Sequence, residues 1–357
     1  MKIIVTHDSP DVDAVTSVWL IKKFLPGWEN AKIQFVPAGE RIRNIKYKIS
    51  NIKSPIEKLG DDEVIHVDTG LGPLDHHQTA DDNVCGASLT WDFVRTNGSG
   101  FASGSSERVK DKIEAISRII RVVVDIDHFK EVFWPNPTAD YYDFALTSIL
   151  DGLKIQKPNK NSYYVEFISE VLDAILHEFE NRIWAEKEIS KNGKKFKTRF
   201  GEGIGFETIN DSVIKLAQKM GYVIALRKDP RKGYVRIKAL PKHSPRSLND
   251  SSKPSGNTHS YEEKKASSPA ESFSKYNDKD SVKSASREGD RVMYSRAKYI
   301  KEIDLTLVYE KLKKIDPDAT WYLHISKKML LNGSVKNPKM RPTKLSLDEI
   351  IKVLKQI

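Results

Sequence analysis

Residues 2–15 read KIIVTHDSPDVDAV, which is a short apolar run followed by a polar stretch and the beginning of a second apolar pattern. The run at 2–6 predicts a strand. The apolar positions from 15 to 24 recur with a helical period, and Pro26-Gly27 ends it. A strand, a polar turn and a helix in this order are typical of an α/β layer.

The chain downstream repeats this alternation. We predict strands over 31–36 and 63–67 and an amphipathic helix over 108–123. Strands separated by helices indicate an α/β fold with a mostly parallel sheet flanked by helices. Ligands in such sheets bind beyond the carboxyl ends of the strands, and the polar motifs of this chain follow its predicted strands.

The sequence pattern of the second half predicts a smaller α+β domain that binds the substrate. A long helix over 162–190 is expected to leave the first domain, which gives domains at 1–160 and 195–357 joined by a connecting helix at 161–194. Helices are predicted at 212–220, 305–315 and 347–357, with strands at 222–227, 233–240 and 321–325. Residues 243–290 contain 13 serines and few aliphatic side chains, so we predict a disordered insertion there.

Composition excludes several classes of protein. Hydrophobic residues make up 39% of the 357, which is enough for two cores. The single cysteine, Cys85, excludes an internal disulfide framework and zinc sites built from several cysteines, and we expect it to be a small buried residue. Because no run of about 18 apolar residues occurs, we expect a cytoplasmic protein that does not insert into a membrane.

Charge is distributed unevenly along the chain. Residues 1–150 carry 17 basic and 22 acidic side chains, whereas the rest of the chain carries a net charge of about +15 by the same count. An acidic half invites metal cations, and a basic half invites phosphates or nucleic acid. Solvated surface lysines would give the same count, so the charge alone leaves the partner open.

Four motifs concentrate potential metal ligands in the first 128 residues. They are His7-Asp8-Ser9-Pro10-Asp11-Val12-Asp13, Asp68-Thr69-Gly70, Asp75-His76-His77 and Asp125-Ile126-Asp127-His128. Each motif alone is weak evidence for a metal site, since an Asp at a strand end often caps a helix. Together they would place several carboxylates at one edge of a sheet, where like charges repel unless cations are present.

Carboxylate and imidazole ligands suit Mn²⁺, Fe²⁺, Co²⁺ and also zinc. Two ions about 4 Å apart, bridged by one carboxylate, can generate a hydroxide near neutral pH and stabilise charge on a phosphoryl group. We expect Asp11 and Asp13 to lie on an extended loop, where alternate side chains can point to different ions.

The order of these motifs resembles the DHH phosphoesterase superfamily, which includes RecJ-like exonucleases, nano-RNases, cyclic-dinucleotide phosphodiesterases and manganese-dependent family II pyrophosphatases. The resemblance covers residues 1–150 strongly and the remainder weakly. The initial His-Asp and the Leu-Asp-His-His-Gln run also look like a poorly described, nuclease-like branch of that superfamily.

The resemblance implies two divalent ions, with Mn²⁺ preferred and Mg²⁺ or Co²⁺ as alternatives. It assigns His7 and Asp11 to one ion, Asp13 and His76 to the other, and Asp68 as the bridge. Asp75 would orient a histidine, and His77 would contact or protonate the phosphoryl group. Asp127 is preferred to Asp125 as the ligand from the fourth motif. His66 and His128 are expected to be structural or exposed.

Members of the resembled superfamily usually carry a second domain with an arginine on a strand, a helix, and a glycine-rich loop that contacts phosphate. This chain has the order but lacks the loop. We expect phosphate contacts from a set of seven residues, which are Arg236, His324, Ser326, Lys327, Lys328, Asn332 and Gly333. A surface lysine pair and a simple hairpin turn are the alternatives for 327–328 and 332–333.

Four aromatic residues after the fourth motif admit two interpretations. Phe133, Trp134, Tyr141 and Tyr142 could stack a base at the rim of a cleft, although packing within the protein is the preferred interpretation.

Three functions follow. The first is a metal-dependent, exonuclease-like phosphodiesterase that acts on short or terminal single-stranded nucleic acid or on a nucleotide. The second is a hydrolase of a small phosphoanhydride or cyclic dinucleotide. The third is a non-catalytic nucleic-acid-binding or regulatory module. A basic half favours a longer anion, because the affinity for a polymer grows with each neutralised phosphate. The oligomeric state stays open.

Overall fold

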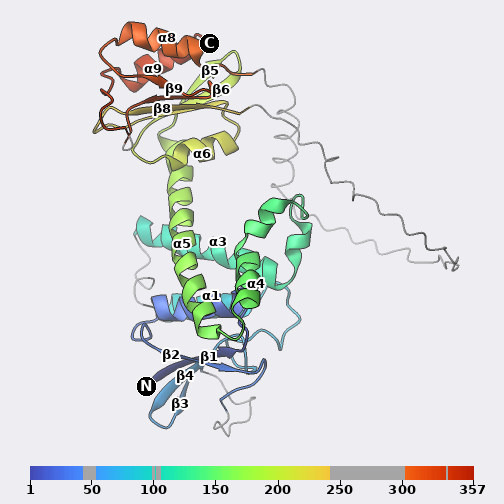
Figure 1. Ribbon diagram of the computed structural model, residues 1–357. Coiled ribbons are helices and arrows are strands. Elements are labelled where there is room, and N and C mark those ends of the chain that lie inside the picture. Colours follow the sequence, from blue (N-terminus) through green and yellow to red (C-terminus); the bar gives the residue numbers. More distant parts are fainter. Residues whose placement is uncertain (43–53, 99–100, 102–105, 242–301, 335–336) are drawn as a thin grey trace, which may run out of the picture. The chain divides into compact units, whose positions relative to one another are not determined.

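A computed structural model describes residues 1–42, 54–98, 101, 106–241, 302–334 and 337–357 (Figure 1). The protein is mixed α/β and divides into two compact units, Met1–Lys187 and Glu188–Ile357. Each unit contains one mixed sheet, in agreement with the predicted α/β class. The predicted disordered insertion at 243–290 lies outside the described residues. No helix within the described ranges is long and apolar enough to cross a membrane.

The sheet of the first unit has the strand order β2-β1-β4-β3. Its strands are β1 (Lys2–His7), β2 (Lys32–Val36), β3 (Ile56–Leu59) and β4 (Asp62–His66). The central strand β1 pairs in parallel with β2 and β4, and only β3 is antiparallel. The carboxyl ends of β1, β2 and β4 therefore meet at one edge, where the first two polar motifs begin.

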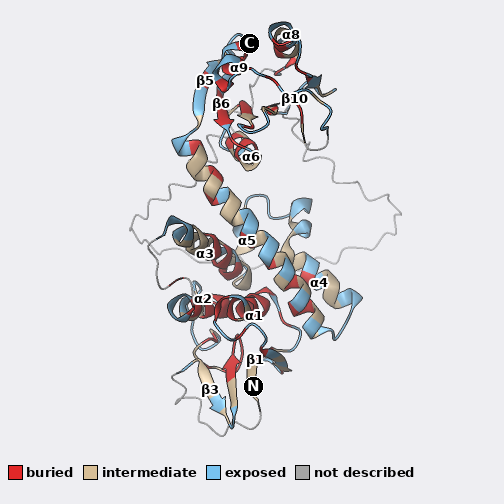
Figure 2. Cartoon of the chain, turned by 90° about the vertical axis from the view of Figure 1, so that its left-hand side faces the viewer, coloured by how far each residue is buried: buried red, intermediate tan, exposed pale blue. Residues whose placement is uncertain are grey.

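Helices bury the central strands of this sheet. They are α1 (Val12–Phe24), α2 (Gly86–Asn97), α3 (Glu107–Asp127), α4 (Leu146–Gln156) and α5 (Asn161–Lys191), with 3₁₀ helices η2 (Lys130–Phe133) and η3 (Asp140–Phe144) between α3 and α4. Buried residues are concentrated on α1, α2 and α3 (Figure 2). Val15 and Leu20 of α1 are completely buried in a core that also contains Ile4 and Ile65 from the sheet.

The long helix α5 packs largely against the first unit. Tyr164, Ile168 and Leu172 lie in the core of the first unit, and the boundary between the two units falls near the end of the helix, after residue 187. Its apolar stripe, which the periodicity identified, therefore packs against the first unit over much of its length.

The second unit is α+β, as its alternation predicts. Its sheet has the order β5-β6-β7-β8-β10-β9, and only β6 and β7 are parallel. The strands are β5 (Lys194–Thr198), β6 (Gly201–Glu207), β7 (Ile224–Lys228), β8 (Val235–Ala239), β9 (Tyr322–Leu323) and β10 (Met329–Asn332). The helices are α6 (Ser212–Lys219), α8 (Thr306–Ile315) and α9 (Leu347–Leu354). The core of the unit combines Leu226 and Ile237 from the sheet with Leu312 and Ile350 from α8 and α9.

Candidate metal centre

The ends of two adjacent parallel strands bring the first pair of polar side chains together. His7 is the last residue of β1, and Asp68 follows β4 by two residues. The Nε2 atom of His7 lies 3.3 Å from Oδ2 of Asp68 and 3.9 Å from Oδ2 of Asp11. The Nδ1 atom of His7 lies 2.9 Å from the carbonyl oxygen of Asp8, which leaves Nε2 directed at the two carboxylates.

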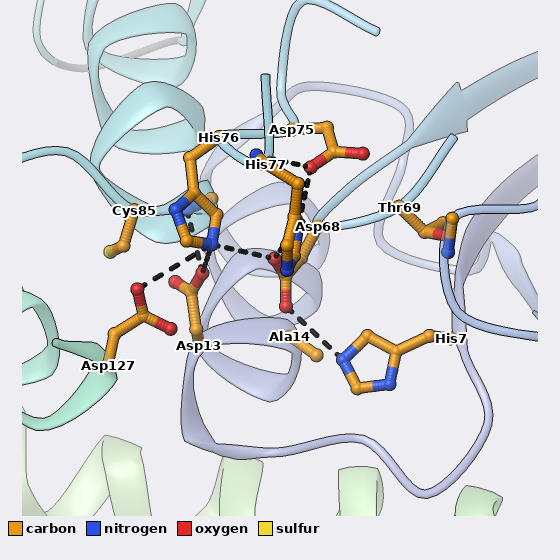
Figure 3. A network of polar contacts seen from close by, with 12 residues as sticks. His7, Asp13, Ala14, Asp68, Thr69, Asp75, His76, His77, Cys85 and Asp127 are labelled. Atoms are coloured by element: carbon orange, nitrogen blue, oxygen red, sulfur yellow. Dashed lines mark hydrogen bonds and ion pairs between the residues drawn. The ribbon is translucent and has the colours of Figure 1, made fainter. Parts of the chain in front are cut away.

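A second group lies on the other side of Asp68. The Nε2 atom of His76 is 3.5 Å from Oδ1 of Asp68, 3.8 Å from Oδ2 of Asp13 and 3.6 Å from Oδ2 of Asp127 (Figure 3). One oxygen of Asp68 thus faces His7 and the other faces His76. The structure brings together the six residues predicted as metal ligands, with Asp68 between two subsets of them.

The fourth motif contributes Asp127, which is the last residue of α3. Asp125 lies outside the cluster and is 3.4 Å from the indole nitrogen of Trp134, which donates to it. The motif forms the carboxyl end of α3, whose last residues include Asp125 and Asp127. His128 lies beside the cluster, with Nε2 2.9 Å from the carbonyl oxygen of Val84 and 3.6 Å from Asp127.

Asp11 and Asp13 do not lie on an extended loop, and that prediction is wrong. Asp11 is the N-cap of α1, where its side chain accepts a hydrogen bond from the backbone of Ala14 at 2.9 Å, and Asp13 lies in the first helical turn. Residues two positions apart on a helix point in directions that differ by roughly 200° about its axis. The two carboxylates therefore diverge, as expected, but for a helical reason.

The amino end of α2 holds Asp13 in place. The backbone N–H of Gly86 donates to Oδ2 of Asp13 at 2.7 Å, and the N–H of Ala87 donates to Oδ1 at 2.6 Å. A helix amino terminus stabilises a carboxylate through these free N–H groups. A Cβ atom on Gly86 would lie 2.9 Å from both Asp13 Oδ2 and Asp68 Cβ, so a glycine is required there. This contact was not predicted, and its only signal in the sequence is the run of small residues after Cys85.

The turn that carries Asp68 is fastened by the loop after β2. Asp68 has a left-handed backbone with φ of +51°. The Arg41 guanidinium donates to the carbonyl oxygen of Gly70 at 2.7 Å and also contacts Glu57 and His66. Because Arg41 Cγ fills the space where a Cβ of Gly70 would lie, the loop and the turn fit closely. His66 is a buried structural residue, as expected, whereas Arg41 was not identified from the sequence.

Asp75 and His77 form a separate pair at the rim of the cluster. Oδ1 of the buried Asp75 is 2.7 Å from Nδ1 of His77, and Oδ2 accepts from the backbone of Leu71 at 2.6 Å. The side chain of His77 is 58% exposed. With Nδ1 occupied by Asp75, Nε2 is the ring nitrogen available to a substrate.

The electrostatics of the cluster favour bound cations. Burial, and then the charge of Asp68, raises the pKa of Asp13 well above its usual range, and burial likewise raises the pKa of Asp127. The hydrogen bond to Asp68 raises the pKa of His76 to about 9. Burial opposes a charged His7, but its hydrogen bond to Asp68 prevails and raises the pKa of His7 to about 9. Without a metal, protons thus take over the neutralising role of a cation.

Two buried oxygens in the cluster have no hydrogen-bond partner within the described part of the chain. They are Oδ1 of Asp68 and Oδ2 of Asp127, and both face His76. A buried polar atom without a protein partner needs a water or an ion to satisfy it, and here the two oxygens converge on one cluster of further donors. Three overlapping groups have donor atoms close enough to hold a metal ion, namely His7–Asp11–Asp68, Asp68–His76–His77 and His76–Asp127–His128. The residues present therefore fit a divalent metal site.

The predicted phosphate contacts lie in the second unit, where several already have partners. Arg236 pairs with Asp211, which also pairs with Arg227. Lys327 lies 3.1 Å from Asp304, and Lys328 lies 3.2 Å from Glu302. The Nδ1 atom of His324 lies 2.9 Å from the hydroxyl oxygen of Ser326.

Asn332 does not contact substrate, and that prediction is wrong. Its side chain is 0% exposed; Nδ2 donates to the carbonyl oxygens of Thr320 and Arg341, and Oδ1 accepts from the backbone of Thr343. These bonds fasten three segments of the unit together. Gly333 has φ of +73°, and a Cβ there would lie 2.2 Å from the ring of Tyr234, so a glycine is needed at this position for the backbone shape of the turn.

Comparisons with known proteins do not identify this chain. No family model matches it, and no curated protein matches it. A crystal structure of an uncharacterized protein from Helicobacter pylori G27 is 11% identical, with a match that covers 67% of this chain and 86% of the other, at a TM-score of 0.19. A likeness at that level carries no argument about fold or function. The function must be inferred from the residues of the cluster themselves.

Proposed function

We propose that this protein is a metal-dependent phosphodiesterase of the DHH type that hydrolyses short or terminal nucleic acid. One observation carries the proposal: the carboxylate of Asp68 lies between two groups of imidazole and carboxylate donors, at the carboxyl edge of a mainly parallel sheet. A carboxylate placed between two sets of donors would fit a pair of divalent ions that share it as a ligand.

The ligand sets follow from the distances. His7 and Asp11 would hold one ion, and Asp13, His76 and Asp127 would hold the other, with Asp68 shared. Mn²⁺ suits this mixture of oxygen and nitrogen donors. When bound, such ions polarise a phosphoryl group and lower the pKa of water. The contribution of the chain is to hold the ligands at fixed positions, through Gly86 and Ala87 on Asp13 and through Arg41 on the Asp68 turn.

His77 is proposed as the proton donor. Attack of water on phosphorus forms one P–O bond and breaks another, and the departing oxygen takes up a proton. The exposed Nε2 of protonated His77 can supply that proton, while Asp75 holds the ring in place through Nδ1. A positioned acid of this kind contributes roughly 10²–10⁴-fold to a rate.

The second unit is proposed to bind the phosphates of the substrate. Residues 188–357, which make up the second unit, carry 37 basic and 20 acidic side chains by sequence, a net charge of +17. Ser326 and Lys327 are exposed and His324 is half-buried, and all three remain proposed contacts, together with Arg236, Lys328 and the backbone at Gly333. A polymeric anion is favoured over a small one because its affinity rises with each phosphate contact, which predicts a steep dependence of binding on salt.

Hydrolysis assays with added Mn²⁺ would test the proposal. The panel contains 5′-labelled DNA and RNA oligonucleotides, dinucleotides, cyclic dinucleotides and pyrophosphate. Asp127→Asn removes a proposed ligand, whereas Asp125→Asn changes the same residue type two positions away, outside the cluster. We expect oligonucleotide cleavage, a loss of at least about 100-fold in kcat for Asp127→Asn, and little change for Asp125→Asn.

Other results would favour other functions. Turnover of only pyrophosphate or cyclic dinucleotides would indicate a hydrolase of small phosphate compounds. Binding of Mn²⁺ without any turnover would contradict the proposed enzymatic function and would indicate a non-catalytic binding or regulatory module. Equal loss in both aspartate variants would contradict the assignment of Asp127.

A further inference from the structure

A groove lies beside the first metal-binding loop, between the edge strand β2 and the beginning of α5. Its volume is about 670 Å³, within the range of roughly 300–1,000 Å³ that is usual for sites of small organic molecules. Residues from both elements line it, among them Gln34 and Phe35 of β2, Asn159 just before α5, and Tyr163 and Glu166 of α5. The groove lies entirely within the first unit.

The groove and the metal cluster share one turn of the chain. Asp8 lines the groove, and its neighbour His7 points into the cluster. Asn161 fastens this turn, because its amide donates to Oδ1 of Asp8 at 3.0 Å and accepts from the N–H of Ser9 at 3.2 Å. Successive residues at the end of a strand point to opposite sides, so a molecule in the groove would lie next to the metal ligands without displacing them.

The groove offers three kinds of surface. Phe35 and Tyr163 are half-buried rings, and Tyr163 is held by a stacked Phe167 at 6.0 Å and by the Lys157 ammonium at 4.1 Å. Gln34 and Asn159 have side-chain amides for which the described residues provide no hydrogen-bond partner. Glu166 has a carboxylate that makes no ion pair within the same ranges, and Lys160 adds a cation at the rim.

This combination matches a nucleoside better than an inorganic phosphate compound. Apolar ring surface suits a flat base, and free amides can donate to and accept from its polar edge. A carboxylate accepts hydrogen bonds from the hydroxyl groups of a ribose, as acidic residues do in dinucleotide sites. Pyrophosphate offers neither a base nor a sugar to these groups.

We infer that this groove is a ribonucleoside subsite, which holds one nucleoside of the substrate next to the bond that is cleaved. Glu166 accepts a hydrogen bond from the ribose 2′-hydroxyl and favours RNA over DNA, while Gln34 contacts the base in either. The inference rests on the proposed phosphodiesterase function, to which it adds a substrate class and a source of discrimination.

Nucleotide binding to the full-length protein would test the subsite directly. The probes are adenosine and uridine 5′-monophosphates and their 2′-deoxy analogues, titrated calorimetrically in the absence of metal. We expect the ribonucleotides to bind about tenfold more tightly than the deoxy forms, and Glu166→Ala to remove that difference. Gln34→Ala should weaken all four by about fivefold. Glu170→Ala, one helical turn further along α5 and exposed, should match the wild type.

A second assay separates failure of the subsite from failure of the proposed function. Bis(p-nitrophenyl) phosphate is a diester without a nucleoside, and all four proteins should hydrolyse it equally with Mn²⁺. The KM of a ribodinucleotide should rise only in Glu166→Ala and Gln34→Ala. Hydrolysis of the synthetic diester with identical nucleotide binding in all four proteins would overturn the subsite alone. No hydrolysis of any diester by wild type would overturn both the function and the subsite.

Discussion

In the first unit, the buried carboxylates of the metal cluster converge without satisfying one another, whereas the buried polar network around Asn332 in the second unit is closed by its own hydrogen bonds. Asp68 and Asp127 each leave a buried oxygen without a partner among the described residues. In the second unit Asp316, Asn332 and Thr343 form a closed set of hydrogen bonds. The difference distinguishes a site that needs an external cation from a polar network that fastens a fold.

The largest effect is expected where the closed network is broken. Asn332→Ala would leave the N–H of Thr343 and the carbonyl oxygen of Thr320 unsatisfied and would remove one of two hydrogen bonds to the carbonyl oxygen of Arg341, at a cost of about 3 kcal/mol in the free energy of unfolding of the second unit. Urea unfolding would measure it, with the exposed Asn192→Ala as control. The affinity for Mn²⁺ should be unchanged, and a loss of that affinity would mean that Asn332 does serve the metal site.

Binding of Mn²⁺ to the cluster should raise the stability of the first unit only. Mn²⁺ at 100 times its dissociation constant is expected to add about 2.7 kcal/mol to the stability of that unit. Hydrogen exchange of the α1 and α2 amides would report it, and the amides of the second unit provide an internal reference. Asp68→Asn should abolish the effect. Equal protection of both units would contradict the contrast between them.

A side chain added next to the metal cluster should weaken Mn²⁺ binding without unfolding the protein. Gly86→Ala places a methyl group 2.9 Å from both Asp13 Oδ2 and Asp68 Cβ, and we expect a 10- to 100-fold (roughly 1.4–2.7 kcal/mol) weaker Mn²⁺ affinity. Gly152→Ala on α4 is the matched control, because nothing lies within 4 Å of its added Cβ. That variant should bind Mn²⁺ normally. Titration calorimetry would compare the two, and equal affinities would show that Asp13 is not held as described.

The smallest effect is the response of the metal-free cluster to pH. The pKa values of His7 and His76 are raised to about 9, so their contribution to stability is complete below pH 6.5 and is lost as the pH rises through about 9. We expect the chelator-treated protein to lose on the order of 1–2 kcal/mol over that range. Mn²⁺ should remove this loss by replacing the protons. Unfolding curves at several pH values would show it, and the opposite slope would contradict it.

Much of the fold was predictable because local patterns agree with it. The apolar run before His7, the helical period after Asp11 and the strand before Asp68 all exist near the expected bounds. The meeting of His7, Asp68 and His76 could be expected because adjacent parallel strands end at a common edge. These features depend on short-range periodicity and on one rule of sheet topology.

The remaining features depend on contacts between distant segments. The helix α2 begins with Gly86 and lacks a side-chain cap, so nothing local shows that its amino end holds Asp13, 73 residues earlier. The role of Asn332 also depends on a distant segment. An Asn-Gly pair is typical of an exposed turn, and only the fold shows that the backbone of Thr343 donates to Asn332. The wrong prediction for Asp11 could have been avoided, because an Asp before an apolar helical pattern is a standard N-cap signal.

The left-handed backbone at Asp68 has a consequence for the evolution of the chain. Among residues with a side chain, Asp and Asn tolerate this conformation best, and Glu does not share that tolerance. A glutamate is therefore disfavoured at this position by the backbone shape. Descendants that lost the need for a cation should drift first to Asn or Gly at this residue. Those two letters at position 68 would mark lineages in which the chemistry was abandoned but the fold was kept.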